Sequence, residues 1–133
     1  MWTKPKKCGN CGTKAVMPKV IDYPVTQTVE MTTYSVIVRN LPAFVCSNCG
    51  EVWLDSTADR LIDREIMKAA GLLLPEEIQS IRARLNLPTE SMASLLGIST
   101  EELGLIEAGD MIQSQSVDRV VRELKDVTAQ SLV

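Results

Sequence analysis

The sequence contains no histidine among its 133 residues. Catalytic zinc sites usually combine histidine or carboxylate ligands with one position left open for water or substrate. Every cysteine falls within a C-x-x-C pair, so no separate thiol is left to act as a nucleophile. Because no nucleophile–base pair can be assembled from these residues, we expect the chain not to be an enzyme.

Aromatic residues are also scarce, since Phe, Tyr and Trp together make up 4% of the chain. The core must therefore be built from Leu, Ile, Val, Met and Ala. No apolar run approaches the length of a membrane span, which predicts a soluble protein with no membrane partner. The start of the sequence, Met1 to Pro5, lacks the apolar segment of a signal peptide and favours a cytoplasmic, reducing location.

A surplus of basic residues is missing as well, because the formal net charge is −3. Nine Lys and Arg against seven Asp and Glu give +2 up to Pro75, and five against ten give −5 from Glu76 onward. Four thiolates bound to one Zn²⁺ would bring the first half to about neutral. Neither half carries the positive charge that is typical of nucleic-acid binding.

All four cysteines lie in two matching knuckles, Cys8-Gly-Asn-Cys11-Gly and Cys46-Ser-Asn-Cys49-Gly. A C-x-x-C turn holds two thiolates close enough to share a metal ion, and the Gly that follows lets backbone amides turn toward the sulfurs. Two such turns complete a tetrahedral shell of four thiolates, which favours zinc over other metals. The sequence therefore predicts one structural Zn²⁺ bound by Cys8, Cys11, Cys46 and Cys49.

Other uses of these cysteines are disulfides, a redox pair or an iron site. Disulfides are disfavoured in a reducing compartment, and a redox C-x-x-C needs a single motif in a βαβ setting. Iron or an iron–sulfur cluster is the main alternative occupant. Four thiolates close the metal's shell, so we expect the metal to hold the fold and its binding to be coupled to folding.

The segment between the knuckles has strand composition. Val25–Val38 is rich in Val and Thr and partly alternates between apolar and polar residues, which predicts one long strand. Ala15–Ile21 and Ala43–Val45 predict shorter flanking strands, and Glu51–Leu54 predicts a closing strand. Trp53 is expected to cover the knuckles or to pack on the sheet. A small antiparallel sheet pinned by two knuckles is typical of a zinc ribbon.

The hydrophobic period changes at Asp55 or Ser56, either of which can cap a helix that ends at Gly71. Pro75 suits the first turn of the next helix. Apolar residues then recur at helical spacing in four groups: Ile78, Ile81 and Leu85; Met92, Ala93, Leu95 and Leu96; Leu103 and Ile106; and Val117, Val120, Val121, Leu124 and Val127. Ser116 is the expected cap of the last helix. We therefore predict one domain over residues 1–70, a linker over 71–75 and a second domain over 76–133.

The second domain has the pattern of a helix-turn-helix of the phage-repressor type. One helix ends at Leu96-Gly97, and after Ile98-Ser99 a second helix runs into Glu107-x-Gly109. Ser99 and Glu102 predict a capping box. The predicted fold is α+β, with an N-terminal four-cysteine, zinc-ribbon-like antiparallel β domain followed by an all-α helix-turn-helix domain. An all-helical bundle with a coincidental glycine turn is the alternative for the second half.

The order of these modules resembles the two-domain bacterial antitoxins of the MqsA (YgiT) type. The likeness covers nearly the whole chain: two C-x-x-C knuckles around a β-rich spacer, one helix, a linker, and Pro75-Glu-Glu-Ile-Gln-Ser-Ile-Arg-Ala-Arg84 leading into the helix-turn-helix. The resemblance implies a zinc-binding domain that neutralises a small ribonuclease-like toxin. It also implies a C-terminal domain that dimerises and represses the toxin–antitoxin operon.

The DNA-contacting positions implied by the resemblance are Thr89, Ser99, Thr100, Glu101 and Leu105. Repressors of this type usually carry Thr-Gln at the start of the second helix, where this chain has Pro88-Thr89. On the recognition helix, the antitoxin family presents an Asn and an Arg to the bases at the positions where this chain has Glu101 and Leu105. Arg and Asn read guanine and adenine, whereas Glu accepts only from cytosine and Leu offers apolar contact. These residues disfavour operator DNA as a partner, and weak or divergent operator binding is the alternative.

Two functions fit these features. The first is an antitoxin of a type II toxin–antitoxin system, and the alternative is a stand-alone helix-turn-helix transcriptional regulator with a structural zinc ribbon. The expected partners are a small toxin, which could add a strand to the free edge of Val25–Val38, and a second copy of the chain. The valine stripe of the last helix could fill the core of its own domain or form that two-fold interface.

Overall fold

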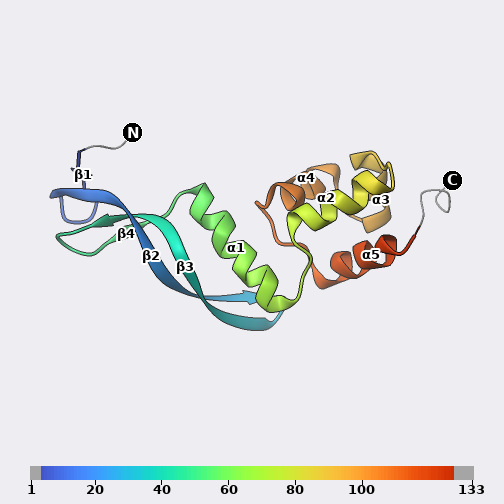
Figure 1. Cartoon of the computed structure of the whole chain (residues 1–133), viewed down its shortest axis with the longest axis horizontal. Coiled ribbons are helices and arrows are strands. Elements are labelled where there is room, and N and C mark those ends of the chain that lie inside the picture. Colours follow the sequence, from blue (N-terminus) through green and yellow to red (C-terminus); the bar gives the residue numbers. More distant parts are fainter. Residues whose placement is uncertain (1–3, 128–133) are drawn as a thin grey trace.

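The structure is a computed structural model and describes residues 4–127, so residues 1–3 and 128–133 of the predicted domains lie outside the described residues. Within this range a four-stranded antiparallel sheet is followed by five α-helices, which gives the predicted α+β class. Figure 1 shows an elongated molecule with the sheet toward one end and the C-terminal helices at the other.

The sheet is built from two long strands with a short strand at each edge. They are β1 (Lys6–Lys7), β2 (Lys14–Val29), β3 (Thr32–Cys46) and β4 (Val52–Trp53). The order is β1-β2-β3-β4, and all neighbours are antiparallel. Because β1 and β4 pair only with the ends of β2 and β3 that lie next to the cysteine knuckles, the rest of the hairpin is a two-stranded arm.

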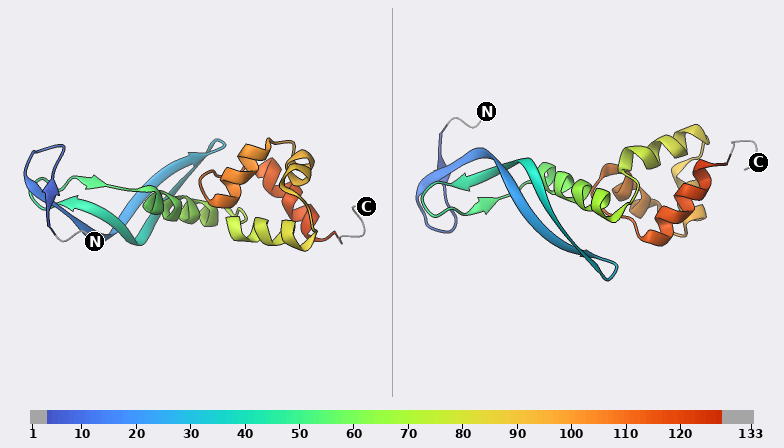
Figure 2. Two further views of the ribbon diagram at one scale, coloured as in Figure 1. Left: turned by 90° about the horizontal axis from the view of Figure 1, so that it is seen from above. Right: turned by 60° about the horizontal axis from the view of Figure 1, so that its bottom comes forward.

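This arm reaches from the cysteine-bearing end toward the C-terminal helices, as Figure 2 shows. At its tip the Glu30 carboxylate accepts a hydrogen bond of 2.8 Å from the backbone N–H of Gln115. Residues 85 positions apart are thus brought together.

The prediction of one strand over Val25–Val38 is wrong, because the chain turns back in the middle of this segment. β2 ends at Val29, β3 begins at Thr32, and these two residues pair. The turn residues Glu30 and Met31 have φ values of 47° and 75°. Two consecutive positive φ values belong to type I′ hairpin turns, which favour Asn and Gly. Glu and Met carry no such signal, so the turn is not visible in the sequence.

The separate flanking strands are also wrong, since each merges with its neighbour through a β-bulge. The pairing register shifts between Ile21 and Tyr23. Asp22 accepts hydrogen bonds from the Asn40 backbone N–H at 3.1 Å and from Arg39 at 3.0 Å, so its carboxylate holds the bulge together. A bulge adds twist without ending a strand, and the hairpin stays continuous.

Helix α1 (Ser56–Ala70) packs on one face of the hairpin. Its predicted ends are confirmed: Asp55 accepts from the Ala58 N–H at 3.0 Å, and Gly71 ends the helix with a φ of 72°. The buried contact consists of Val38, Leu41, Ala58 and Ile62, with Ile21, Tyr23, Val25, Val36 and Leu54 half-buried around it. The buried side of the helix is centred on Ala58, Ile62 and Ile66, and Leu61 is 38% exposed.

Four further helices follow: α2 (Pro75–Arg84), α3 (Thr89–Leu96), α4 (Thr100–Ala108) and α5 (Gln115–Lys125). The predicted stops at Gly97 and Gly109 are confirmed, with φ values of 71° and 83°. The predicted cap of the last helix is wrong, because Ser114 and not Ser116 accepts from the Val117 N–H, at 3.1 Å.

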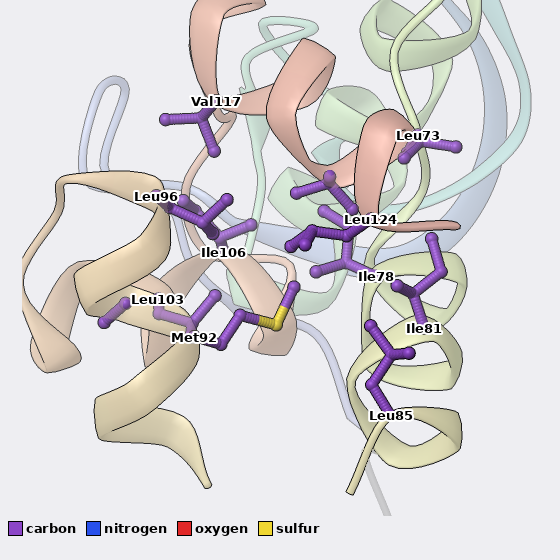
Figure 3. Close-up of a cluster of buried hydrophobic side chains, with 12 residues drawn as sticks. Leu73, Ile78, Ile81, Leu85, Met92, Leu96, Leu103, Ile106, Val117 and Leu124 are labelled. Atoms are coloured by element: carbon purple, nitrogen blue, oxygen red, sulfur yellow. The ribbon is translucent and has the colours of Figure 1, made fainter. Parts of the chain in front are cut away.

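A buried apolar cluster joins these helices (Figure 3). It contains Leu73, Ile78, Ile81, Leu85, Met92, Ala93, Leu96, Leu103, Ile106, Val117, Val121 and Leu124. Three residues of the valine stripe thus lie inside the core of this part, and Val120 is partly buried against it. Burial of one such side chain stabilises the fold by about 1.5–3 kcal/mol, so these residues serve the chain's own core.

The segment between α1 and α2 is held firmly in place. The Leu73 N–H donates to the buried Asp118 carboxylate at 2.8 Å, and the Leu73 carbonyl accepts from the Gln113 side chain at 2.8 Å. Arg122 donates to Asp118 at 2.7 Å and to the Gly71 carbonyl at 2.6 Å. The predicted linker is therefore pinned to α5 and the loop before it.

Ion pairs connect α1 to the helices that follow. Arg60 donates to Asp110 at 2.7 Å and 3.2 Å, and Arg64 forms a two-pronged pair with Glu76. None of the helices within residues 4–127 is long and apolar enough to cross a membrane.

Candidate metal centre

The two knuckles fold in the same way. In the first, the Cys8 N–H donates to the Thr13 carbonyl and the Gly12 N–H donates to the Cys8 carbonyl, both at 2.9 Å. The second repeats the tight turn, with the Gly50 N–H donating to the Cys46 carbonyl at 2.8 Å. Gly12 and Gly50 have φ values of 78° and 80°, a conformation that glycine adopts without steric cost. The Gly after each second cysteine is therefore required by the turn.

The knuckles bring all four sulfurs together, as the spacing predicts. The Sγ atoms of Cys8, Cys11, Cys46 and Cys49 all lie within 4.8 Å of one another. The Cys8–Cys49 and Cys11–Cys46 pairs are each 3.7 Å apart, and both join one knuckle to the other. A tetrahedral shell with metal–sulfur bonds of about 2.3 Å has edges of about 3.8 Å. The arrangement fits one metal ion and is not a pair of disulfides.

The site has a buried side and an exposed side. Cys8 and Cys46 are buried, whereas Cys11 and Cys49 are exposed. The buried pair packs with Val16, and Phe44 and Trp53 lie against this cluster. Trp53 therefore covers the knuckles, as expected. Because apolar atoms back two of the four ligands, metal binding and packing of this end of the sheet are linked.

Two asparagines contribute to the site and were not singled out by the sequence. Asn10 Nδ2 donates to Cys49 Sγ at 3.6 Å, and Asn48 Nδ2 donates to Cys11 Sγ at 3.4 Å. Each asparagine thus bonds a sulfur of the opposite knuckle. The signal that could have found them is their identical place, immediately before the second cysteine of each knuckle.

Hydrogen bonds and burial set the acidity of the thiols in opposite directions. Burial raises the pKa of Cys8 to about 11. The Asn48 side chain, together with backbone N–H donation, lowers the pKa of Cys11 to about 5. The pKa of Cys49 is lowered by a backbone hydrogen bond and by Asn10. Donors aimed at sulfur favour the thiolate, which is the form that binds metal.

The residues singled out for DNA contact lie on two helices. Thr89 begins α3 and is half-buried. Ser99 caps α4, accepting from the Glu102 N–H at 3.0 Å, so the Ser99 half of the predicted capping box is present. Thr100, Glu101 and Leu105 are exposed on α4. The structure thus brings Thr100, Glu101 and Leu105 to the surface of a single helix, with Ser99 engaged at its start.

Comparison with known proteins finds no matching protein-family model and no matching curated protein. The function is therefore inferred from the cysteine cluster, the sheet and the surfaces of the helices.

Proposed function

We propose that this protein is an antitoxin that binds and neutralises a small ribonuclease-like toxin through its cysteine-bearing sheet, and that it performs no catalysis itself. The observation that carries the proposal is a closed cluster of four cysteines at the base of a long two-stranded arm. Such a unit offers a stable binding surface and no open metal position for chemistry. The resemblance in module order to MqsA-type antitoxins supports the same assignment.

The metal is proposed to be one structural Zn²⁺. Four thiolates form a soft, closed and tetrahedral ligand set, which zinc occupies more readily than the hard cations. Cys8, Cys11, Cys46 and Cys49 would hold it, and Asn10 and Asn48 would orient the sulfurs. Iron is the competing occupant, and elemental analysis of the purified protein separates the two.

The surface proposed to meet the toxin is the outer edge of β2. In the described part of the chain, β1 pairs with β2 only at Lys14 and Val16, so the edge beyond them has no neighbouring strand. An extended segment of a partner can add to such an edge through backbone hydrogen bonds. Thr28 lies on this edge close to the tip of the arm.

The helical part is proposed to be a repressor-type helix-turn-helix that also mediates dimerisation. α3 and α4 pack together around Leu96 and Leu103, and Gly97 makes the turn between them with its left-handed backbone. The same arrangement favours the second candidate, a stand-alone transcriptional regulator. A two-fold interface would draw on residues outside the core, because Val117, Val121 and Leu124 are already buried in it.

The test is affinity purification from the native host of the protein carrying a C-terminal tag, with mass spectrometry of the proteins that co-elute. A stoichiometric small basic protein is the expected result. It should be lost from Cys11→Ser, which removes a metal ligand, and retained by Ser47→Ala, which changes an exposed neighbour in the other knuckle. Promoter DNA retained with no protein partner would replace the antitoxin assignment by that of a regulator.

The edge assignment has its own variant pair. Thr28→Pro removes a backbone donor from the arm, whereas Thr28→Ala removes the hydroxyl alone. We expect the toxin to be lost from the first and retained by the second, with metal content unchanged in both. A partner retained by Thr28→Pro would show that strand addition at this edge is not the mode of binding.

A further inference from the structure

The outward side of α4 combines an exposed apolar residue with small and acidic neighbours. Glu101, Leu105 and Ala108 are spaced so that they share one side of the helix, and Gly104 lies beside them. All four are exposed, and the Leu105 residue retains 46% of its accessible surface. We call these four residues the α4 face. The buried residues of the helix, Leu103 and Ile106, point the other way into the core.

Helix α4 carries Glu101, Glu102 and Glu107 and no basic residue, and Arg60 and Arg64 lie only beside its end, around Ala108. No Lys or Arg occurs from Leu85 to Asp118, a stretch that contains six Asp and Glu residues. Three of these acids form ion pairs with arginines outside the stretch: Glu107 with Arg82, Asp110 with Arg60, and Asp118 with Arg122. The other three, Glu90, Glu101 and Glu102, are in no ion pair within residues 4–127. Glu90 lies within electrostatic reach of Arg82, so Glu101 and Glu102 are the carboxylates at the start of α4 that have no cationic partner in this part of the chain.

The helix that carries this face is fixed at both ends. Ser99 caps its start, and Gly109 closes its end in the left-handed conformation. Glu107 is held by Arg82 through two hydrogen bonds of 2.8 Å and 2.9 Å, in a partly buried contact. A rigid face loses little conformational entropy when a partner docks on it.

These properties do not suit a nucleic acid. Phosphates are bound by Lys and Arg through release of counterions, and uncompensated carboxylates repel them. Leu105 offers apolar contact and no hydrogen bond to a base edge. The same properties suit a polypeptide with basic side chains and apolar anchors.

We propose that the α4 face is a docking site for a cationic amphipathic helix of a partner protein. The apolar side of that helix covers Leu105, and the lack of bulk at Gly104 and Ala108 lets the two helices approach closely. Its Lys and Arg residues pair with Glu101 and Glu102. This site is separate from the sheet edge assigned to the toxin and does not depend on that assignment.

A synthetic helical peptide with Leu on one side and Lys on the other is the probe, titrated against the metal-loaded full-length protein by fluorescence anisotropy. Its matched control has the same Lys residues with Ser in place of Leu. We expect the first peptide to bind more weakly as salt is raised and the second not to bind. Chemical shift changes in heteronuclear NMR spectra are expected to centre on Glu101, Gly104 and Leu105.

Variants locate the contact without disturbing the fold, because the altered side chains are exposed. Leu105→Ala should weaken peptide binding about tenfold, and Glu101→Lys should weaken it by a similar factor and reduce its salt dependence. Ile37→Ala, which shortens a side chain 52% exposed on β3, is the matched control and should leave affinity within about twofold. Equal binding by Leu105→Ala and Ile37→Ala would overturn the proposal.

Other occupants would also overturn it, and each has its own readout. Absence of peptide binding, or shifts centred away from α4, removes the site. If duplex DNA shifts the same amide signals and binds with higher affinity than the peptide, the face belongs to a nucleic-acid site. If the unliganded protein is a dimer in sedimentation experiments and Leu105→Ala makes it a monomer, the face binds a second copy of the chain.

Discussion

Asn10 and Asn48 occupy equivalent places in the two knuckles, and each side chain donates to a sulfur of the other knuckle. Asn48 also donates to the Thr13 hydroxyl at 3.2 Å, so it ties the knuckles together in two ways. Donors of this kind fix the ligand and disperse its negative charge, and removing one typically costs about 10–100-fold in metal affinity.

We therefore expect Asn48→Ala to bind zinc at least about tenfold more weakly than the unchanged protein, measured by competition with a chromophoric chelator. Ser47→Ala is the control, because the Ser47 hydroxyl faces the Ala15 carbonyl at 3.5 Å and no sulfur. Equal affinities for the two variants would mean that the side-chain N–H···S bond contributes nothing to metal retention.

The pH dependence of metal release follows from the thiols. The pKa of Cys11 is lowered from 9.0 to about 5, mainly by Asn48, so its thiolate persists at lower pH than that of an ordinary cysteine. The stabilisation that this thiolate provides is fully present above pH 9.0, the ordinary pKa of a cysteine thiol. It is lost as the pH falls through about 5, the lowered pKa of Cys11. In Asn48→Ala the Cys11 pKa rises toward its ordinary value. The midpoint of acid-induced zinc release should then move upward by roughly half to one pH unit, as followed with a zinc indicator.

At the scale of the elements, the ends of the helices are set by short-range signals. Asp55, Gly71, Gly97, Ser99 and Gly109 are the caps that the sequence indicates, and the structure has each at its predicted place. A cap depends on one side chain or one backbone conformation, so a single residue can reveal it. The hairpin turn at Glu30 and Met31 uses no preferred turn residue, which explains why the predicted strands were wrong.

The clustering of the four cysteines was predictable for a similar reason. The four ligands follow from spacing alone, since C-x-x-C pairs meet wherever the sheet places the two knuckles side by side. The roles of Asn10 and Asn48 depend on which knuckle faces which, and only the folded sheet sets that relation.

Two glycines on neighbouring segments test the turn between α3 and α4. Gly97 has a φ of 71°, and a Cβ there would meet no atom within 4 Å, so the cost of a side chain is purely that of the backbone conformation. We expect Gly97→Ala to lower the free energy of unfolding by about 1–2 kcal/mol in denaturant titrations. Gly104→Ala is the matched control, because Gly104 lies within α4 and a Cβ there would also meet no atom within 4 Å. Since Ala favours a helix over Gly, we expect this variant to raise the free energy of unfolding by up to about 1 kcal/mol. Changes of the same sign would contradict the assigned turn.

At the scale of the whole molecule, α1, which packs on the sheet, is joined to α5 by polar contacts of the segment that follows α1. Asp118 accepts from the Leu73 backbone, from the Gln113 side chain at 3.1 Å and from Arg122, and the Asp118 residue is only 5% exposed. Leu73 itself packs in the core of the helical part. One carboxylate therefore satisfies three donors that connect the end of α1 to α5.

Asp118→Ala leaves those donors without their acceptor. Water cannot take the place of the carboxylate at the buried Leu73 N–H unless the junction opens. We expect a loss of about 3 kcal/mol in the free energy of unfolding. Glu123→Ala is the control, because Glu123 is exposed on the same helix, and its effect should stay within about 0.5 kcal/mol. Circular dichroism follows the unfolding of the helices, and a metal indicator follows the opening of the cysteine-bearing end of the sheet. The unchanged protein should lose both in one transition and Asp118→Ala in two, because the junction couples the parts. A single transition at an unshifted midpoint in Asp118→Ala would show that the sheet and the helices are held together without it.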